Sequence, residues 1–161
     1  MSNLLVQNIK HTNGTTAQTI DSSGRVTTST NRPAFMARRT SSQSAGIVIF
    51  DTAVLNQGSH YNTSDGKFTA PIAGLYNFSF CCLSDNDGTD AYFAMSLHIN
   101  GSSYANVQFR TEDDNDFGGS MSIIASLSAS DYVQVNSPNV PVYGASATTS
   151  NFSWFSGYLI G

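Results

Sequence analysis

The sequence is poor in charge and lacks long apolar runs. Only 11% of its 161 residues are charged, whereas an average domain has roughly 25%. The formal net charge of -4 argues against a nucleic-acid partner, because phosphate contacts require clustered lysine and arginine. No apolar stretch approaches the roughly 20 residues that span a bilayer, and residues 1–10 lack the features of a secretory signal. We therefore expect a protein made in a cytoplasm that neither enters a membrane nor binds nucleic acid.

The two cysteines, Cys81 and Cys82, are adjacent in the sequence. Neighbouring residues of a strand point to opposite faces, so a disulfide between these two is not expected. A disulfide scaffold is therefore excluded, and one or two free, partly buried thiols are predicted instead.

Catalytic motifs are also missing. The three histidines, His11, His60 and His98, do not accompany a recognisable nucleophile motif, and the sequence has no Gly-x-Ser-x-Gly elbow. It has no phosphate-binding loop or dinucleotide fingerprint either. We predict no enzymatic activity, no catalytic residue and no cofactor.

Serine, threonine, asparagine and glycine replace the missing charge, a mixture that favours strands joined by polar turns. Apolar and polar residues alternate along 75–83 and 91–100, with the period of a half-buried strand. Asp65-Gly66 and Asn100-Gly101 are hairpin signals. These patterns predict an all-β, antiparallel sandwich or jelly roll of about eight to ten short strands. The predicted strands are 47–50, 75–83, 91–100, 102–110, 120–127, 131–135 and 151–160.

Residues 1–33 differ from the rest of the chain because they contain few apolar side chains. Asn13-Gly14 and the run 21–24 are turn signals between short extended runs. Such a segment could not fold alone. We predict that residues 1–33 form an extended N-terminal stem or attachment arm, and that residues 34–161 form the jelly-roll domain.

One set of residues carries more specific information, because a known family reproduces its spacing at every position. The run reads Phe, five residues, Asn, four, an aromatic residue, six, Phe, five, and then Gly-x-Tyr-x-Phe-x-Phe. Its members are Phe50, Asn56, Tyr61, Phe68, Gly74, Tyr76, Phe78 and Phe80. This set resembles the fold signature of the C1q globular-head family. The resemblance covers about 34–161, although Ser130 stands where the family usually has glycine.

The resemblance implies a ten-stranded jelly roll, similar to tumour necrosis factor, that packs as a homotrimer. The signature residues also have plain folding roles. Aromatic side chains such as Phe68 and Phe78 fill the space between two sheets about 10 Å apart. Asn56 and Asp65 suit turns that need hydrogen bonds from side chain to backbone. The signature therefore identifies the fold and not a reaction.

A second resemblance lies in residues 12–26. The sequence Thr-Asn-Gly-Thr-Thr-Ala-Gln-Thr-Ile-Asp-Ser-Ser-Gly-Arg-Val is similar to a segment of phage fibre and virion-accessory proteins. It favours a homotrimeric accessory protein on a virion surface, of the capsid decoration or cement type, attached to other virion proteins through residues 1–33. Two alternatives stay open. One is the receptor-binding tip of a phage tail fibre that binds a host glycan or surface protein, and the other is a cellular C1q-like recognition module.

Two acidic runs are candidates for binding calcium, which prefers carboxylate oxygens. They contain Asp85, Asp87, Asp90, Asp113, Asp114 and Asp116. Neither run has the spacing of an EF-hand. A solvated acidic loop is the interpretation that we favour, with calcium as the alternative.

Four aromatic residues outside the signature are candidates for sugar-binding platforms: Tyr104, Tyr143, Trp154 and Tyr158. Residues 152–159 place apolar side chains on both faces of the expected strand. That pattern favours the core or a trimer interface over an open sugar site.

Overall fold

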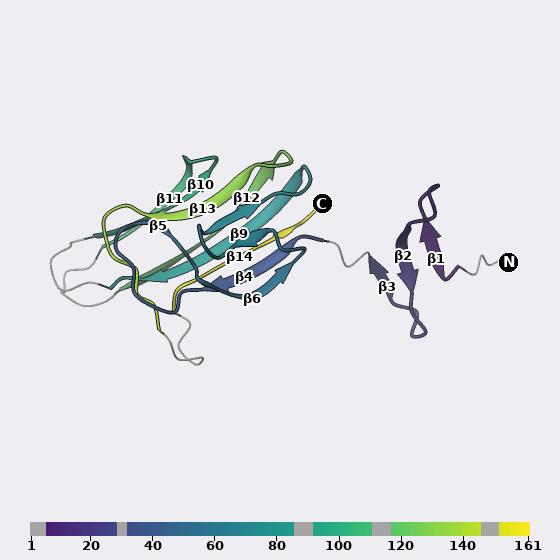
Figure 1. Cartoon of the computed structure of the whole chain (residues 1–161), viewed down its shortest axis with the longest axis horizontal. Helices are drawn as coiled ribbons and strands as arrows, with labels where there is room; N and C mark the ends of the chain where they lie inside the picture. Colours follow the sequence, from purple (N-terminus) through teal and green to yellow (C-terminus); the bar gives the residue numbers. More distant parts are fainter. Residues whose placement is uncertain (1–5, 29–31, 86–91, 111–116, 146–151) are drawn as a thin grey trace. The chain divides into compact units, whose positions relative to one another are not determined.

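The computed structural model describes residues 6–28, 32–85, 92–110, 117–145 and 152–161. The chain divides into two compact units, Met1–Arg32 and Pro33–Gly161. The described residues of both units form strands, turns and bends without a helix (Figure 1). Accordingly, no helix among them is long and apolar enough to cross a membrane. The predicted all-β class is confirmed.

The N-terminal unit is a small antiparallel sheet. Its strands are β1 (Asn8–Lys10), β2 (Thr16–Ile20) and β3 (Val26–Thr28), in the order β1-β2-β3. Gly14 and Gly24 have φ angles of 87° and 75° in the two connecting turns. Glycine adopts this left-handed conformation without strain, which is why both turns form where the sequence predicts them.

Asp21 closes the turn between β2 and β3. Its carboxylate accepts hydrogen bonds from the backbone N–H groups of Arg25 and Ser23, both at 2.9 Å, and the Arg25 side chain lies 2.8 Å away. These bonds, led by the one from the Arg25 N–H, lower the pKa of Asp21. The turn is therefore stabilised by the ionised form of the carboxyl group.

The second unit, which we call the head, consists of two antiparallel sheets. The first sheet has the order β11-β10-β13-β8-β7, and β5 also pairs with β13. Its strands are β5 (Gly46–Val48), β7 (Tyr61–Asn62), β8 (Lys67–Thr69), β10 (Tyr92–Ile99), β11 (Ser102–Arg110) and β13 (Tyr132–Ser137). The second sheet has the order β12-β9-β14-β4-β6. Its strands are β4 (Ala34–Arg38), β6 (Thr52–Gln57), β9 (Gly74–Leu83), β12 (Gly118–Leu127) and β14 (Trp154–Leu159).

Two short strands, β5 and β8, share one edge of β13. β5 pairs with residues 135–137 of β13, and β8 pairs with Tyr132 and Val133. The six residues of β13 therefore pair with two three-residue strands along the same edge. This division gives the described part of the head more strands than the ten that the resemblance implies.

Strand β6 has no alternating pattern, and the sequence did not predict it. A register shift opposite Met36 and Ala37 of β4 leaves Val54 as an extra residue in β6. Val54 and its neighbour Leu55 are both exposed, by 60% and 49%. A β-bulge of this kind breaks the period of two, so periodicity alone cannot find the strand.

Aromatic rings fill the space between the two sheets of the head. Strand β9 turns Tyr76, Phe78, Phe80 and Cys82 inward, each at most 1% exposed, as its alternation predicted. The ring of Phe35, on β4, stacks on those of Tyr61 and Phe68, with centroids 4.7 and 4.9 Å apart. These contacts join strands of both sheets into one core.

Gly157 of β14 faces this cluster and leaves room for it. A Cβ at this position would lie 2.5 Å from Cδ1 of Phe78 and 2.8 Å from Cε1 of Phe35. The two rings therefore occupy the volume that any other side chain would need.

Two turns of the head use positive φ angles. Asn100 and Gly101 have φ of 51° and 81° and connect β10 to β11, which confirms the predicted hairpin. Ser130 has a φ of 74°. Its position favours glycine, the residue that the C1q family usually has there, so the departure at Ser130 places a side chain in a strained conformation.

Candidate functional site

The signature residues lie inside the head and hold its two sheets together. Six of them are aromatic and at most 3% exposed: Phe50, Tyr61, Phe68, Tyr76, Phe78 and Phe80. Gly74 begins β9, where a Cβ would meet Leu159 Cδ1 at 2.8 Å and the Gly161 carbonyl oxygen at 2.9 Å. The aromatic signature residues thus offer no surface to a ligand, which agrees with their expected folding role.

Asn56 lies near the end of strand β6 and begins the turn that follows, because its carbonyl accepts a hydrogen bond from the Ser59 N–H at 3.2 Å. Its side-chain amide donates a hydrogen bond to the Tyr61 carbonyl at 2.8 Å and accepts one from the Tyr61 N–H at 3.1 Å. The amide therefore replaces a backbone partner for Tyr61. The Tyr61 hydroxyl donates to the Phe50 carbonyl at 3.3 Å, and burial raises the pKa of this hydroxyl.

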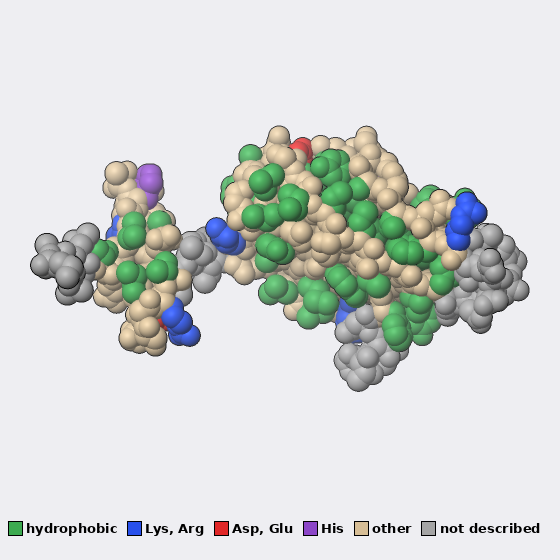
Figure 2. Space-filling view, turned by 180° about the vertical axis from the view of Figure 1, so that it is seen from behind, with side chains coloured by type: hydrophobic (Ala, Val, Ile, Leu, Met, Phe, Trp, Pro, Cys, Tyr) green, Lys and Arg blue, Asp and Glu red, His purple; other side chains and the backbone are tan. Residues whose placement is uncertain are grey.

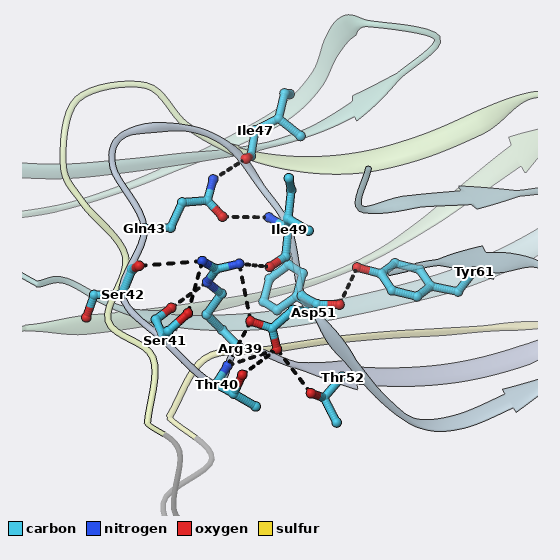
Figure 3. Close-up of polar contacts among 11 residues, drawn as sticks. Arg39, Thr40, Ser41, Ser42, Gln43, Ile47, Ile49, Asp51, Thr52 and Tyr61 are labelled. Carbon is cyan, nitrogen blue, oxygen red and sulfur yellow. Dashed lines mark hydrogen bonds and ion pairs between the residues drawn. The ribbon is translucent and has the colours of Figure 1, made fainter. Parts of the chain in front are cut away.

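A polar cluster that the sequence analysis missed surrounds Arg39 (Figure 3). The Arg39 guanidinium donates to the carbonyl oxygen of Ile49 at 2.6 Å and to that of Ser41 at 2.5 Å. It also lies 3.4 Å from the Asp51 carboxylate. No motif points to this cluster, because most of the acceptors are backbone carbonyls whose positions depend on the fold.

Asp51 and Gln43 complete the cluster. The Asp51 carboxylate accepts hydrogen bonds from the Thr40 and Thr52 hydroxyls at 2.8 and 3.1 Å. The Gln43 side-chain amide donates a hydrogen bond to the Ile47 carbonyl and accepts one from the Ile49 N–H, both on the facing segment. Every group in this set is engaged within the chain, so the cluster fixes the segments 39–43 and 47–52 against each other and leaves no group for a substrate.

The calcium hypothesis falls mostly on residues outside the described part of the chain. Asp87, Asp90, Asp113, Asp114 and Asp116 all lie there. Asp85 is described, and its backbone N–H donates to the Pro141 carbonyl at 2.9 Å. Within the described ranges, no group of three or more His, Cys, Asp or Glu side chains is arranged to hold a metal ion. Calcium binding therefore stays a prediction.

The most distinctive surface of the head is the outer face of the five-stranded sheet. Asn77 of β9 pairs with Ile124 on one side and Tyr158 on the other, and Leu75 lies two residues earlier on the same face. Ile124, Tyr158 and Leu75 are 55%, 52% and 47% exposed. Three large apolar side chains from adjacent strands thus lie together in solvent.

Small hydroxyl side chains occupy the centre of this outer face. Ser79 pairs with Ser122 of β12 and with Ser156 of β14. The Ser79 hydroxyl donates to that of Ser122 at 2.8 Å. None of the outward positions on β9, β12 and β14 carries a charged side chain. On the side of the molecule seen in Figure 2, hydrophobic side chains likewise lie among polar ones, and charged side chains are few.

Two of the four candidate sugar platforms lie on this outer face. Trp154 is half-buried and shares the face with Tyr158, because both alternate with the inward Phe155 and Gly157. Tyr104 is 50% exposed and its hydroxyl donates to the Ile124 carbonyl at 3.5 Å. The inner face of β14 lies in the core, and its outer face is partly exposed, with Tyr158 at 52%. The expectation that both faces are covered stays a prediction.

Both cysteines are free thiols on opposite faces of β9. Cys82 is buried in the core, and burial raises its pKa. Cys81 is half-buried on the outer face beside Trp154, and burial raises its pKa as well. Both groups are therefore mostly protonated near neutral pH, which makes either a poor nucleophile or metal ligand.

Known proteins resemble this chain over the head. The C1q domain model matches residues 34–160. Complement C1q tumor necrosis factor-related protein 3 of Mus musculus is 26% identical over 127 residues, which cover 79% of this chain and 49% of that protein. Complement C1q tumor necrosis factor-related protein 2 of Mus musculus is 35% identical over 66 residues, which cover 41% of this chain and 20% of that protein. The chain thus spans about half the length, or less, of these relatives.

Solved structures of low sequence identity have the same fold. The globular domain of zebrafish complement 1qA has a TM-score of 0.64 at 19% identity, covering 80% of this chain and 98% of that one. Eiger TNF from S. frugiperda has a TM-score of 0.66 at 8% identity, covering 81% of this chain and 94% of that one. These matches confirm the predicted C1q/TNF-like jelly roll.

None of the relatives named here is a virion protein, and none of these matches supports the phage resemblance of residues 12–26. The family model, in contrast, covers nearly the whole head and well over half of the sequence. On these grounds the chain belongs to the C1q domain family.

Proposed function

We propose that the chain carries the trimer-forming recognition head of a C1q-like protein, and that three copies meet through the outer face of the five-stranded sheet. C1q/TNF-like domains form homotrimers and serve as recognition or signalling modules without enzymatic activity. The observation that carries the proposal is the joint exposure of Leu75, Ile124 and Tyr158 on this outer face.

Covering these side chains stabilises a trimer. Each is about half exposed in one chain, and full burial of such a side chain contributes about 1.5–3 kcal/mol. Removing the remaining exposure therefore contributes about 1 kcal/mol for each residue. Because every chain supplies the same three residues, the contributions accumulate around a threefold axis.

The centre of the outer face is suited to close contact between identical copies. Ser79, Ser122 and Ser156 have small side chains, so neighbouring chains can approach without steric conflict. A charged group on such a face would meet its own copy near the symmetry axis and be repelled. The outward positions of β9, β12 and β14 carry no charge, so this part of the face avoids the repulsion. The charged Arg38 of β4 lies on the same face beside Trp154.

A trimer presents each loop of the head three times. Weak contacts of single loops then combine into firm binding to a surface that repeats the same ligand. This is the physical basis of a recognition module, and it requires no catalytic group.

The virion interpretation of the sequence now has less support than its cellular alternative. It rests on residues 12–26, whereas the family match covers residues 34–160 and the named relatives are complement-type proteins. Capsid decoration and the tail-fibre tip stay predictions from that short segment. Labelled antibody on purified particles would test both.

The trimer is tested by placing a charge on the outer face. Wild-type protein at micromolar concentration should scatter light with a mass close to three times 17.2 kDa. Tyr158→Arg brings three guanidinium groups into the buried contact and should give the monomer. Tyr92→Arg is the matched control, because Tyr92 is 41% exposed but belongs to β10 of the other sheet; this variant should stay trimeric.

Two results would contradict the proposal. A wild-type mass near 17.2 kDa would exclude the trimer itself. A trimeric Tyr158→Arg variant would show that the copies meet through another surface. Circular dichroism of both variants checks that each one is folded.

A further inference from the structure

The N-terminal unit has one apolar face, set by the pairing of its strands. Ile20 of β2 pairs with Val26 of β3, and Ile9 of β1 pairs with Gln18 of β2. Paired residues point to the same side of a sheet, and so do Gln18 and Ile20, which are two residues apart. Ile9, Ile20 and Val26 therefore share one face.

The opposite face of the same sheet is polar. Asn8 and Thr19 pair with each other, and the Thr19 hydroxyl donates to the Asn8 side-chain carbonyl at 3.1 Å. The unit is thus amphipathic, with the two-sided pattern of a sheet that covers something on one side.

Among residues 6–28, the described part of this unit, the apolar face stays largely open to solvent. Ile9 is 51% exposed and Val26 is 60% exposed, while Ile20 is half-buried. In Figure 2 hydrophobic side chains gather in the middle of the unit, with polar ones around them. A sheet of three short strands buries little else, so a partner on this face is needed for its stability.

We propose that this apolar face packs against the same face of the N-terminal units in the two sister chains, so that residues 6–28 form a threefold stem. This inference rests on the trimer of the proposed function. The occupant of the face is a second and a third copy of the chain, and not a foreign protein.

The short connection to the head supports sister chains as the occupants. β3 ends at Thr28 and β4 begins at Ala34, so the link spans at most about 20 Å even when fully extended. In a trimer of heads, three N-terminal units are therefore confined to a small volume. Their effective concentration then reaches the millimolar range, well above that of any free partner.

The chemistry of the face also suits identical copies. Ile9, Gln18, Ile20 and Val26 carry no charge, so copies can meet through these four residues without repulsion. A register shift separates Ile9 from Lys10, the next residue of β1. The charges of the turn after β2 are neutralised locally, because Asp21 and Arg25 pair with each other at 2.8 Å. A surface for a charged partner would instead present unpaired charge.

Crosslinking tests which face of the stem is shared. Val26→Cys places a thiol on the apolar face, and Asn8→Cys places one on the polar face as the matched control. Both are made in full-length Cys81→Ser protein, whose remaining native thiol, Cys82, is fully buried. A short bis-maleimide should link Val26→Cys chains within the trimer roughly ten times faster than Asn8→Cys chains, because linkage requires thiols that lie close together.

The mass of each sample by light scattering separates the two proposals. A trimer in which Val26→Cys links and Asn8→Cys does not supports the stem. A trimer in which neither links, or both link equally, overturns the stem and leaves the trimeric head intact. A monomer overturns both. Cys81→Ser without a new thiol gives the background rate, and circular dichroism confirms that each variant is folded.

Discussion

Gly157→Ala probes the point at which the core of the head has least room. The new Cβ would lie 2.5 Å from Cδ1 of Phe78 and 2.8 Å from Cε1 of Phe35, about 1 Å closer than favourable carbon contacts. Neither ring can yield easily. Phe35 stacks on Tyr61 and Phe68 at centroid distances of 4.7 and 4.9 Å, and Phe78 contacts Phe68 at 5.6 Å.

The expected cost follows from two opposing terms. Overpacking of a buried site costs about 1–3 kcal/mol, whereas replacing glycine by alanine restricts the unfolded chain and returns about 0.4–1 kcal/mol. We therefore expect a net loss of about 1–2 kcal/mol in the free energy of unfolding. For a domain of this size the melting temperature should fall by about 3–8 °C.

Thermal unfolding followed by circular dichroism measures this change. All samples must have the same protein concentration, because the melting temperature of an oligomer depends on it. Ser102→Ala is the control: Ser102 is exposed on β11 of the other sheet, so the melting temperature of this variant should change by no more than about 1 °C. If Gly157→Ala melts at or above the wild-type temperature, the rings are not held as described and the reasoning fails.

Two further predictions concern backbone strain and thiol chemistry. Ser130→Gly relieves a φ of 74° at a left-handed position that costs other residues about 1–2 kcal/mol. Glycine also gives the unfolded chain more freedom, which offsets about 0.5–1 kcal/mol of this relief. The free energy of unfolding measured in urea should therefore rise by about 0.5 kcal/mol. A lower urea midpoint than that of the wild type would contradict this. Burial raises the pKa of both thiols. The alkylation rate of Cys81 should therefore rise only at a pH above about 9, the ordinary pKa of a cysteine thiol. Cys82 should react only after unfolding; mass spectrometry showing equal labelling of both at pH 8 would refute its burial.

The sequence allowed the central strands and their inward faces to be predicted from simple alternation. β9 is the clearest case, because Tyr76, Phe78 and Phe80 alternate with polar or small residues that point outward. Asn100-Gly101 likewise predicted its hairpin, since both residues tolerate positive φ. These features depend on neighbours in the chain, and the chain alone therefore reveals them.

Other features depend on residues that are distant in sequence. Strand β6 escaped prediction because its bulge opposite Met36 removes the period of two. The Arg39 cluster escaped because its acceptors are carbonyls brought together by folding. For the outer face of β14 the sequence left the core and a trimer interface open, since the pattern of Trp154 and Tyr158 looks the same whether a second sheet or a sister chain covers it.

The pairing of β4 with β14 has a mechanical consequence. The two strands run antiparallel, with Ala34 opposite Tyr158 and Arg38 opposite Trp154, so the first and last strands of the head leave it at the same end of one sheet. A pulling force applied between residues 33 and 161 would load their hydrogen bonds one after another, as a zipper opens, and not all at once in shear. Peeling β14 away would also draw Phe155 out of the core. Tension between its two ends therefore opens the head by breaking the β4–β14 hydrogen bonds in sequence, which takes less force than shearing the same bonds together.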